Sequence, residues 1–418
     1  MLKNVTNELL EYDLCINNNW SFSSLFQFYP TYIFSLFTEK DKIDTKMKYG
    51  ETEENKNTIE IEYCCSVGSL KKRMGILGIN LNKVKEYFND EVGFDFEEVV
   101  DSFKFLVDKE IDDNGDIYKL LDKIEENDNK FNFLDALCDD KYGINGRNGI
   151  SVDLRILLRS ALEAFSEEDE VSLYINIDND EQYYNPYLPD EIVNDLNVVS
   201  YYQNNLLAKS VNEGKIIVLT EGSSDIEFLQ KSLNLLYPEL AYLFSFFDFK
   251  QVKSQGGTST IINYLKSFIS AGFNNRIIVI LDNDTAGNEA YKQIQTISSI
   301  PINYKIFTLP EIDIANKYPT IGPQSKNFNM NINGKAVSIE LFLGKDLLLN
   351  DENCYFPALW TGYNDKLKQY QGEISAKFQI QENFRKKIAQ IENGTKKIED
   401  YDWTEMKSLL DKIFTAFE

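Results

Sequence analysis

Histidine is absent from this chain of 418 residues. Catalysis that needs an imidazole, whether in a Ser-His-Asp or a Cys-His arrangement or as a general base, is therefore excluded within the chain. Zinc sites built on histidine and ribonuclease chemistry that needs an Arg-x-His pair are excluded for the same reason. The chemistry that remains belongs to carboxylates, lysines and bound metal ions.

Cysteine is scarce too, with five residues and no CxxC pair. We expect reduced, buried thiols in a cytoplasmic protein at Cys15, Cys64, Cys65, Cys138 and Cys354. The sequence has no GxxxxGK[ST] motif, so it predicts no P-loop ATPase. It also has no uninterrupted apolar run of 18 residues and no signal pattern at its start, so we expect no membrane segment.

Basic side chains are outnumbered, because 43 lysines and arginines stand against 67 acidic residues and give a net charge of -24. Proteins that coat nucleic acid usually carry a basic face, so this balance argues against tight, unspecific binding. It does not exclude a nuclease, since divalent cations and a local basic strip can offset a global acidic charge. The balance predicts that a partner or a masked site controls access to nucleic acid.

The chain is long enough for two or three domains. In the first region, 1–205, an aromatic segment from Trp20 to Tyr29 precedes a predicted strand, NTIEIEYCCSV. Two helices with a glycine turn between them follow in SLKKRMGILGINLNKVKEYF, and later come an amphipathic helix, LRILLRSALEAF, and a strand, VSLYINI. This order predicts an α+β domain.

From about Gly214 the pattern alternates between apolar strands and amphipathic helices. The predicted strands are KIIVLT, FSFFDF, RIIVIL and INYKIFTL, and such alternation predicts a parallel sheet covered by helices over 214–345. The segment AVSIELFLG is expected to be a strand or the start of a helix. The remainder, 346–418, is predicted to be a mostly helical extension that completes this module.

Acidic residues follow the apolar strands of the second region. Glu221 ends one strand, with Asp225 one turn into the next helix, and Asp282 and Asp284 end another; Glu340 lies in an apolar setting. Neighbouring parallel strands bring their carboxyl ends to one edge of a sheet, where ligands bind. Crowded carboxylates repel unless a cation neutralises them, and oxygen ligands favour Mg²⁺ or Mn²⁺.

Each of these acidic residues also has a simpler explanation. An acidic residue after a strand is often only a helix N-cap or a turn former, and Glu340 could be the partner of a buried lysine. The combination is more specific, because both motifs follow buried strands in order, with a glycine-rich turn at Gly256 and Gly257 between them.

The segments LTEGSSDIEFL, QGGTS and VILDNDTAG resemble the Toprim domain, in the form found in OLD-family nucleases and their bacterial defence relatives. The resemblance implies a Rossmann-like parallel sheet with flanking helices. It also implies that Glu221 is the Toprim glutamate, that Asp282 and Asp284 are the DxD pair, and that Asp225 is the second acidic residue of the OLD-type first motif. The segments NGKAVSIELFLGKDLL and YQGEISAKFQIQENF look like the C-terminal part of such proteins.

The first region is similar to the HEPN/Toprim N-terminal domain, which implies a sensory or regulatory role. The whole resemblance implies a nuclease for DNA or RNA that depends on Mg²⁺ or Mn²⁺ and acts as a regulated effector in bacterial antiphage defence. OLD nucleases carry an ATPase domain in the same chain, whereas this sequence has none. ATP-linked control would therefore need a separate ATPase as partner, and an oligomer is possible.

Further residues are expected to surround the substrate. Lys377 is a candidate for the catalytic lysine of OLD-type sites, which would stabilise phosphate charge. Alternatively, it belongs to a basic helical face with Arg385, Lys386 and Lys387 that holds the phosphate backbone. The motif glycines expected in the loops around the phosphate are Gly222, Gly256, Gly257 and Gly287.

Two other functions remain open. IIVILDNDTAG also fits the hhhhDxDxT signature of haloacid-dehalogenase-type phosphatases, in which Asp282 would be the nucleophile and Asp284 the acid and base. That motif should lie on the first strand, whereas here a strand ending in Glu221 precedes it. The second alternative is a non-catalytic module that uses a Toprim fold only to sense a signal or bind nucleic acid.

Overall fold

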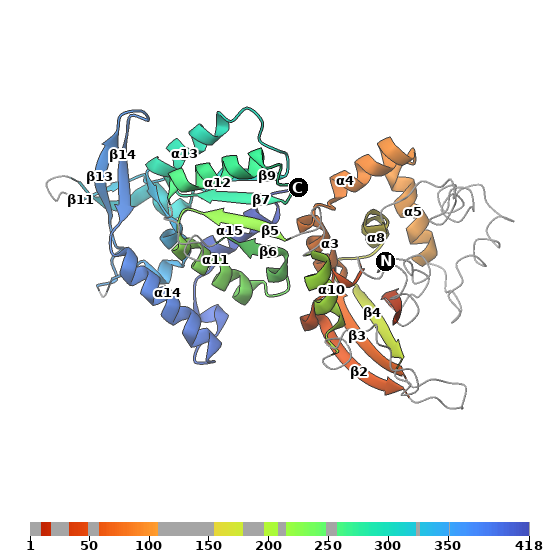
Figure 1. Ribbon diagram of the computed structural model, residues 1–418. Helices are drawn as coiled ribbons and strands as arrows, with labels where there is room; N and C mark the ends of the chain where they lie inside the picture. The colour runs from red at the N-terminus through yellow and green to blue at the C-terminus, as the bar shows by residue number, and fades with distance from the viewer. Residues whose placement is uncertain are drawn as a thin grey trace. The chain divides into compact units, whose positions relative to one another are not determined.

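The protein forms two compact units, Met1–Ser210 and Val211–Phe417 (Figure 1). In this computed structural model, the described residues are 10–17, 33–48, 58–107, 154–178, 196–207, 215–247, 257–322, 327–350 and 352–417. The predicted region 1–205 falls within the first unit, and the predicted regions 214–345 and 346–418, the latter up to Phe417, fall within the second. The predictions for the aromatic segment Trp20 to Tyr29, for Cys138 and for Gly256 lie outside the described residues. Among the described cysteines, Cys15 is buried and Cys64 and Cys65 are half-buried, but Cys354 is exposed, so the prediction of a buried thiol is wrong there.

The first unit contains an antiparallel four-stranded sheet in the order β1-β4-β3-β2. Its strands are β1 (Leu10–Ile16), β2 (Lys42–Lys48), β3 (Thr58–Ser66) and β4 (Glu170–Asp178). Alternate residues such as Ile61 and its partner Ile175 point into the core, as expected for a sheet with one buried face. The described helices are α3 (Val67–Ile76), α4 (Leu81–Glu86), α5 (Phe96–Val107), α8 (Leu154–Leu162) and α10 (Val198–Leu207), with a π-helical turn, η3 (Tyr87–Val92), after α4. The predicted α+β fold is confirmed.

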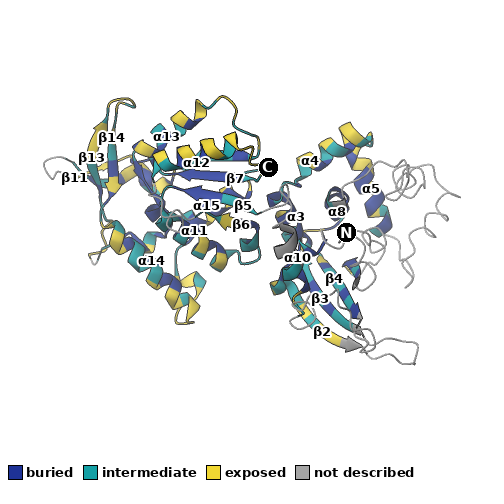
Figure 2. Ribbon diagram, viewed as in Figure 1, coloured by how far each residue is buried: buried dark blue, intermediate teal, exposed yellow. Residues whose placement is uncertain are grey.

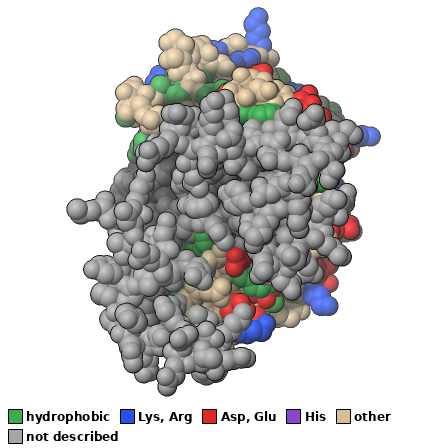
Figure 3. Space-filling model, turned by 90° about the vertical axis from the view of Figure 1, so that its right-hand side faces the viewer, with side chains coloured by type: hydrophobic (Ala, Val, Ile, Leu, Met, Phe, Trp, Pro, Cys, Tyr) green, Lys and Arg blue, Asp and Glu red, His purple; other side chains and the backbone are tan. Residues whose placement is uncertain are grey.

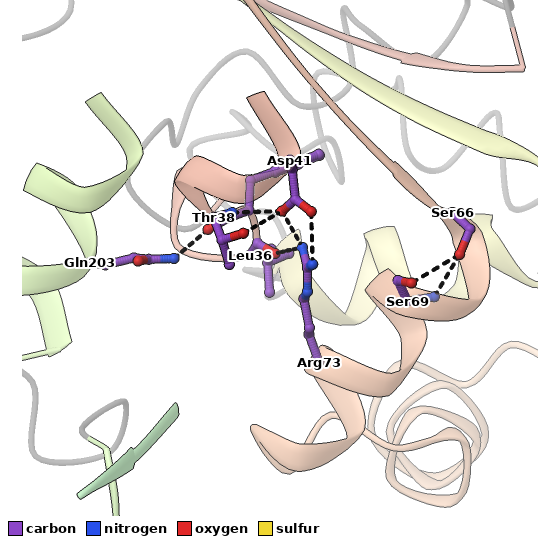
Figure 4. Close-up of polar contacts among 8 residues, drawn as sticks. Leu36, Thr38, Asp41, Ser66, Ser69, Arg73 and Gln203 are labelled. Carbon is purple, nitrogen blue, oxygen red and sulfur yellow. Dashed lines mark hydrogen bonds and ion pairs between the residues drawn. The ribbon is translucent and has the colours of Figure 1, made fainter. Parts of the chain in front are cut away.

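A buried ion pair fastens helix α3 to the segment before β2 (Figure 4). The Arg73 guanidinium lies 2.7 Å from Oδ2 and 3.0 Å from Oδ1 of Asp41, and it also donates to the Leu36 carbonyl oxygen at 2.9 Å. Arg73 is only 1% exposed. Asp41 further accepts a hydrogen bond from the Thr38 backbone amide at 2.7 Å. The Asp41 carboxylate is therefore held by the backbone as well as by the opposite charge of Arg73.

The second unit is built on a parallel sheet in the order β6-β5-β7-β9. Its strands are β5 (Ile216–Thr220), β6 (Phe244–Phe246), β7 (Ile277–Leu281) and β9 (Tyr304–Thr308). Helices α12 (Thr258–Ser270) and α13 (Thr285–Gln295) cover one face, while α11 (Ser223–Leu236) and α15 (Thr404–Phe414) cover the other (Figure 1). The central strands are buried on both faces (Figure 2), which is why they read as continuous apolar runs. The predicted parallel sheet is confirmed.

The segment after residue 346 differs in part from expectation. It is helical from α14 (Lys377–Glu392) onward, but β13 (Ala358–Asn364) and β14 (Gln369–Ile374) form a hairpin before it. This hairpin extends a second sheet, in the order β11-β10-β13-β14, with β10 (Tyr318–Ile321) and β11 (Asn327–Met330). Its aromatic and threonine content favours strands over helix.

The segment AVSIELFLG forms the short strand β12 (Ala336–Val337) and the 3-10 helix η7 (Ile339–Phe342). No helix among the described residues combines the length and the apolar character that crossing a membrane requires. On the face drawn in Figure 3, acidic and basic side chains of the described residues lie interspersed.

Candidate active site

Two acidic residues meet at the carboxyl edge of the parallel sheet. Strands β5 and β7 are neighbours, with Thr220 opposite Ile280, so the residues that follow them emerge side by side. The Asp282 backbone amide donates a hydrogen bond to Glu221 Oε1 at 2.9 Å. The prediction that Glu221 and Asp282 share one edge of the sheet therefore agrees with the structure.

The second acidic residue of the DxD motif begins helix α13. Asp284 Oδ1 accepts a hydrogen bond from the Gly287 backbone amide at 2.7 Å, which makes Asp284 the N-cap of the helix. The residues Asn283–Asp284 also form strand β8, which pairs with β12. The simple N-cap explanation and the site explanation thus both apply to Asp284.

Asp225 lies in the first turn of α11. Its Oδ2 accepts a hydrogen bond from the Gly222 backbone amide at 2.8 Å, and Ser224 Oγ lies 3.4 Å from its Oδ1. Burial and the charge of Glu340 raise the pKa of Asp225. The charge of Asp225 in turn helps to raise the pKa values of Glu221 and Asp282, so the three carboxyl groups interact electrostatically.

Glu340 and Lys377 form the other side of the site. Because β12 pairs with β8, the 3-10 helix that follows it holds Glu340 near the DxD loop, where it is 3% exposed. Glu340 Oε2 accepts from Ser338 Oγ at 2.5 Å and lies 3.8 Å from Lys377 Nζ, while Oε1 accepts from Gln381 Nε2 at 2.8 Å. Glu340 therefore does have a lysine partner, although the Lys377 side chain keeps 38% of its surface exposed.

Three carboxyl groups of the site, those of Glu221, Asp225 and Asp282, have raised pKa values. Burial raises the pKa of Glu221 to about 7 and that of Asp225 to about 6. Burial also raises the pKa of Asp282 well above its usual value, and the charges of Asp225, Glu221 and Asp284 add to that effect. Burial alone would lower the pKa of Lys377, but the charges of Glu340, Asp282 and Asp284 outweigh it and the pKa is raised.

The donor set suits a hard divalent cation. Carboxylate oxygens are the ligands that Mg²⁺ and Mn²⁺ prefer, and their mutual repulsion leaves this edge in need of positive charge beyond Lys377. Among the described residues, no three acidic or cysteine side chains already stand in the arrangement of a metal site. Glu221 accepts a hydrogen bond across the site from the Asp282 amide, whereas Asp225 and Asp284 each accept one from a backbone amide three residues away at the start of a helix.

The motif glycines differ in what they do. A Cβ on Gly287 would lie 2.1 Å from the Asp282 carbonyl oxygen and 3.1 Å from Glu221 Oε1, so only glycine allows α13 to begin this close to the carboxylates. Gly257 adopts a φ of +109°, which favours glycine, and its amide donates to the Glu221 carbonyl oxygen at 2.8 Å. Gly222 has ordinary extended backbone and serves through its amide.

The predicted basic face of α14 is largely occupied by other contacts. Lys387 is 1% exposed, and its ammonium group donates to the carbonyl oxygens of Leu343 and Asp402 at 2.9 and 2.6 Å. The prediction that Lys387 contacts nucleic acid is therefore wrong. Burial also lowers the pKa of the Lys387 ammonium group to about 8. Arg385 donates two hydrogen bonds to the Glu227 carboxylate, at 2.9 and 2.8 Å, while Lys386 is exposed.

We call the five carboxyl groups of the site, those of Glu221, Asp225, Asp282, Asp284 and Glu340, the acidic cluster. Three residues near it were not predicted. Gln371 on β14 donates to Asp284 Oδ2 at 2.7 Å and accepts from the Ala286 amide at 3.0 Å, so it fixes the start of α13. Ser338 and Gln381 orient Glu340. A glutamine in a strand carries no signal of its own, but the alternation of QYQGEI could have placed Gln371 on the face opposite Tyr370.

Two family models match the chain. The HEPN/Toprim N-terminal domain 1 model matches residues 11–178, and the Toprim-like model matches residues 240–318, which include Asp282 and Asp284. Neither the curated proteins nor the solved structures include a significant match. Toprim domains are typical of enzymes that bind divalent metals such as Mg²⁺ and process nucleic acids. With its parallel sheet and the acidic residues at its edge, the chain is a Toprim protein that carries a HEPN/Toprim N-terminal domain.

Proposed function

We propose that the second unit hydrolyses phosphodiester bonds of DNA or RNA in a reaction that depends on Mg²⁺ or Mn²⁺. The observation that carries this proposal is the contact between Glu221 and Asp282 at the ends of two neighbouring parallel strands. Asp225 and Asp284 add to the negative charge there. Such a site is stable in its charged form only when a cation compensates it.

Each residue would contribute in a distinct way. Glu221, Asp225, Asp282 and Asp284 would supply oxygen ligands, with Glu340 as a further ligand or as the group that orients Lys377. A divalent ion bound there would polarise a phosphoryl oxygen and activate water. The Lys377 ammonium group, 3.8 Å from Glu340, is suited to stabilise negative charge that develops on the phosphate.

We infer further that this nuclease is a regulated effector in bacterial antiphage defence and acts in the cytoplasm. The OLD-type resemblance supports the defence role, and the net charge of -24 supports regulation, because it repels a polyanion over roughly 8 Å at physiological salt. With Lys387 buried and Arg385 paired, less of the α14 face is free to offset that repulsion. A partner, such as a separate ATPase, or an oligomer that presents a basic groove would relieve it.

The alternatives are less well supported. In a haloacid-dehalogenase-type phosphatase the DxD motif should follow the first strand, whereas here it follows β7, after β5 and β6. A purely non-catalytic module would not need three carboxylates with raised pKa values at one edge.

The test uses the purified full chain with plasmid, tRNA and single-stranded oligonucleotides, in Mg²⁺, Mn²⁺ or EDTA, with and without candidate partners. We expect cleavage that needs metal and increases strongly with the partner or trigger. Glu221→Gln and Asp282→Asn should each lower the rate by about a thousandfold or more. Glu289→Gln is the control, because Glu289 lies in helix α13, which follows the DxD motif, but its carboxylate pairs with Lys366.

The outcomes separate the proposals. Wild-type rates in either site variant would refute a carboxylate–metal mechanism. Hydrolysis of a small phosphomonoester without cleavage of nucleic acid would favour the dehalogenase-type phosphatase. Efficient degradation by the isolated chain at physiological salt, with no gain from any co-purified component, would refute regulation but leave the nuclease proposal intact.

A further inference from the structure

Three aromatic rings form a continuous row on the β13–β14 hairpin. The Tyr363 and Tyr370 ring centroids lie 5.2 Å apart at an interplanar angle of 71°, and those of Trp360 and Tyr370 lie 6.0 Å apart at 55°. Tyr363 is 53% exposed and Tyr370 is 52% exposed. We call Trp360, Tyr363 and Tyr370 the aromatic ladder.

The register of the hairpin places all three rings on one face. Tyr363 pairs with Tyr370, and Trp360 pairs with Gly372, two residues further along β14. Residues two apart in a strand share a face. Gly372 has no side chain to obstruct this arrangement: a Cβ there would lie 3.0 Å from the Trp360 ring.

The edge of β14 and its face opposite Tyr370 are both fixed to the segment that carries the DxD motif. On that face Gln371 donates to Asp284 Oδ2 and accepts from the Ala286 amide, and at the edge the Tyr370 carbonyl oxygen accepts from Thr285 Oγ1 at 2.7 Å. Strand β14 therefore bears Tyr370 of the aromatic ladder on one face and holds an active-site aspartate through Gln371 on the other. A ligand on the ladder would lie one strand away from the acidic cluster.

The hairpin is electrically neutral within an acidic protein. Between Ala358 and Ile374 the sequence has two basic and two acidic side chains, whereas the whole chain has 43 and 67. Lys366 pairs with Glu289, and Lys368 in the hairpin turn is exposed. The exposed rings thus lie where the repulsion of an anionic ligand is weaker than the net charge of the chain suggests.

We propose that the aromatic ladder stacks unpaired bases of a single-stranded stretch of nucleic acid and so presents the adjoining backbone to the acidic cluster. This inference rests on the proposed nuclease function. Aromatic side chains bind single strands through the π-face that every base has, and the bases of a duplex are not free to stack in this way. We therefore expect a preference for single strands with little dependence on sequence.

A cross-strand aromatic pair also stabilises a hairpin by itself. That role alone predicts no effect of the rings on nucleic-acid binding, so binding separates the two explanations. Replacing both tyrosines by leucine keeps apolar side chains on the face but removes the flat rings. Replacing them by phenylalanine keeps the rings and removes only the hydroxyl groups.

The experiment measures binding of a labelled single-stranded oligonucleotide and of its duplex by fluorescence anisotropy, with Ca²⁺ in place of Mg²⁺. We expect the wild type to prefer the single strand and Tyr363→Leu/Tyr370→Leu to bind it at least about tenfold more weakly. Tyr363→Phe/Tyr370→Phe should stay within about twofold of the wild type. Phe273→Leu is the control, since Phe273 is an exposed aromatic in the loop before β7, at the other end of the parallel sheet.

A second measurement does not depend on the leucine variants being folded. The single strand should quench tryptophan fluorescence in the wild type, and Trp360→Phe should remove most of that quenching. The proposal is overturned if the wild type binds no single strand, if the leucine variant binds as the wild type does, or if the phenylalanine variant loses binding equally. Single-strand binding through the ladder without cleavage under any metal would support the ladder and count against the nuclease, whereas cleavage with normal binding by the leucine variant would do the reverse.

Discussion

Both units hold charged side chains away from water, but they balance them differently. In the first unit the Arg73 guanidinium meets the Asp41 carboxylate at two short distances, so the buried charges cancel. In the second unit the acidic cluster of Glu221, Asp225, Asp282, Asp284 and Glu340 has Lys377 as its ion-pair partner, 3.8 Å from Glu340. A buried pair with matched charges holds a fold together, whereas a buried excess of one sign indicates a site for a ligand of the other sign.

The largest effect on stability is expected from breaking the balanced pair. Arg73→Met leaves the Asp41 carboxylate partly buried and unpaired, which should lower the free energy of unfolding by about 3–5 kcal/mol in urea titrations. Lys46→Met is the control, because Lys46 and its partner Asp44 are 60% and 44% exposed, so solvent screens this pair and its loss should change the stability little. Equal effects of the two substitutions would contradict the structural role of the pair.

A smaller but still clear effect is expected where α13 approaches the acidic cluster. In Gly287→Ala the new methyl group would meet the Asp282 carbonyl oxygen, so the helix or the loop must shift. We expect a loss of about 1–3 kcal/mol of stability and a loss of metal-dependent cleavage. Gly362→Ala is the matched control, because nothing lies within 4 Å of the position its Cβ would take. Unchanged cleavage in Gly287→Ala would show that the site does not depend on this approach.

Removing one negative charge from the acidic cluster should not lower the free energy of unfolding and could raise it, in contrast to the two substitutions above. Glu221→Gln or Asp282→Asn relieves repulsion in the metal-free protein, so each should leave the stability unchanged or raise it by roughly 1 kcal/mol. Urea titration in EDTA measures this. A loss of several kcal/mol in both variants would mean that these carboxylates are structural, as Asp41 is.

The stability of the metal-free protein should depend on pH because the acidic cluster has more negative groups than positive ones. The pKa of Glu221 is raised to about 7 and that of Asp225 to about 6, so their protonated forms favour the folded state. This contribution is fully present at low pH and is lost as the pH rises to about 7. In EDTA the melting temperature should therefore fall between about pH 4.5 and 7, and Mn²⁺ should reduce that fall. A profile that is identical with and without Mn²⁺ would argue against metal binding in this cluster.

Much of the second unit could be predicted from the sequence, because continuous apolar strands and helical periodicity identify a parallel sheet and the residues that follow its strands. That argument places Glu221 beside Asp282 without any coordinates. The position of Glu340 was less determined, since it depends on the short pairing between β12 and β8. The sequence identified Glu340 as a candidate but gave no sign of its contact with Gln381.

Two features of the second unit differ from what the sequence predicts. Lys387 reads as part of a basic helical face, but its burial depends on carbonyl oxygens of Leu343 and Asp402, which come from distant loops. The hairpin 358–374 lies in the stretch 346–418, which is predicted to be mostly helical. Its aromatic residues and the turn at Asn364–Lys368 were the available strand signal.

The acidic cluster is proposed to bind a divalent cation, because Lys377 is a single positive charge beside five carboxyl groups. Isothermal titration calorimetry of Mn²⁺ into the metal-free protein at pH 7, in two buffers of different ionisation enthalpy, tests it directly. We expect wild-type binding with release of protons, because carboxylates with raised pKa values must lose them to bind the ion. Asp282→Asn should abolish that binding, and Asp41→Asn should not. Absence of binding in the wild type, or equal binding in Asp282→Asn, would contradict the account.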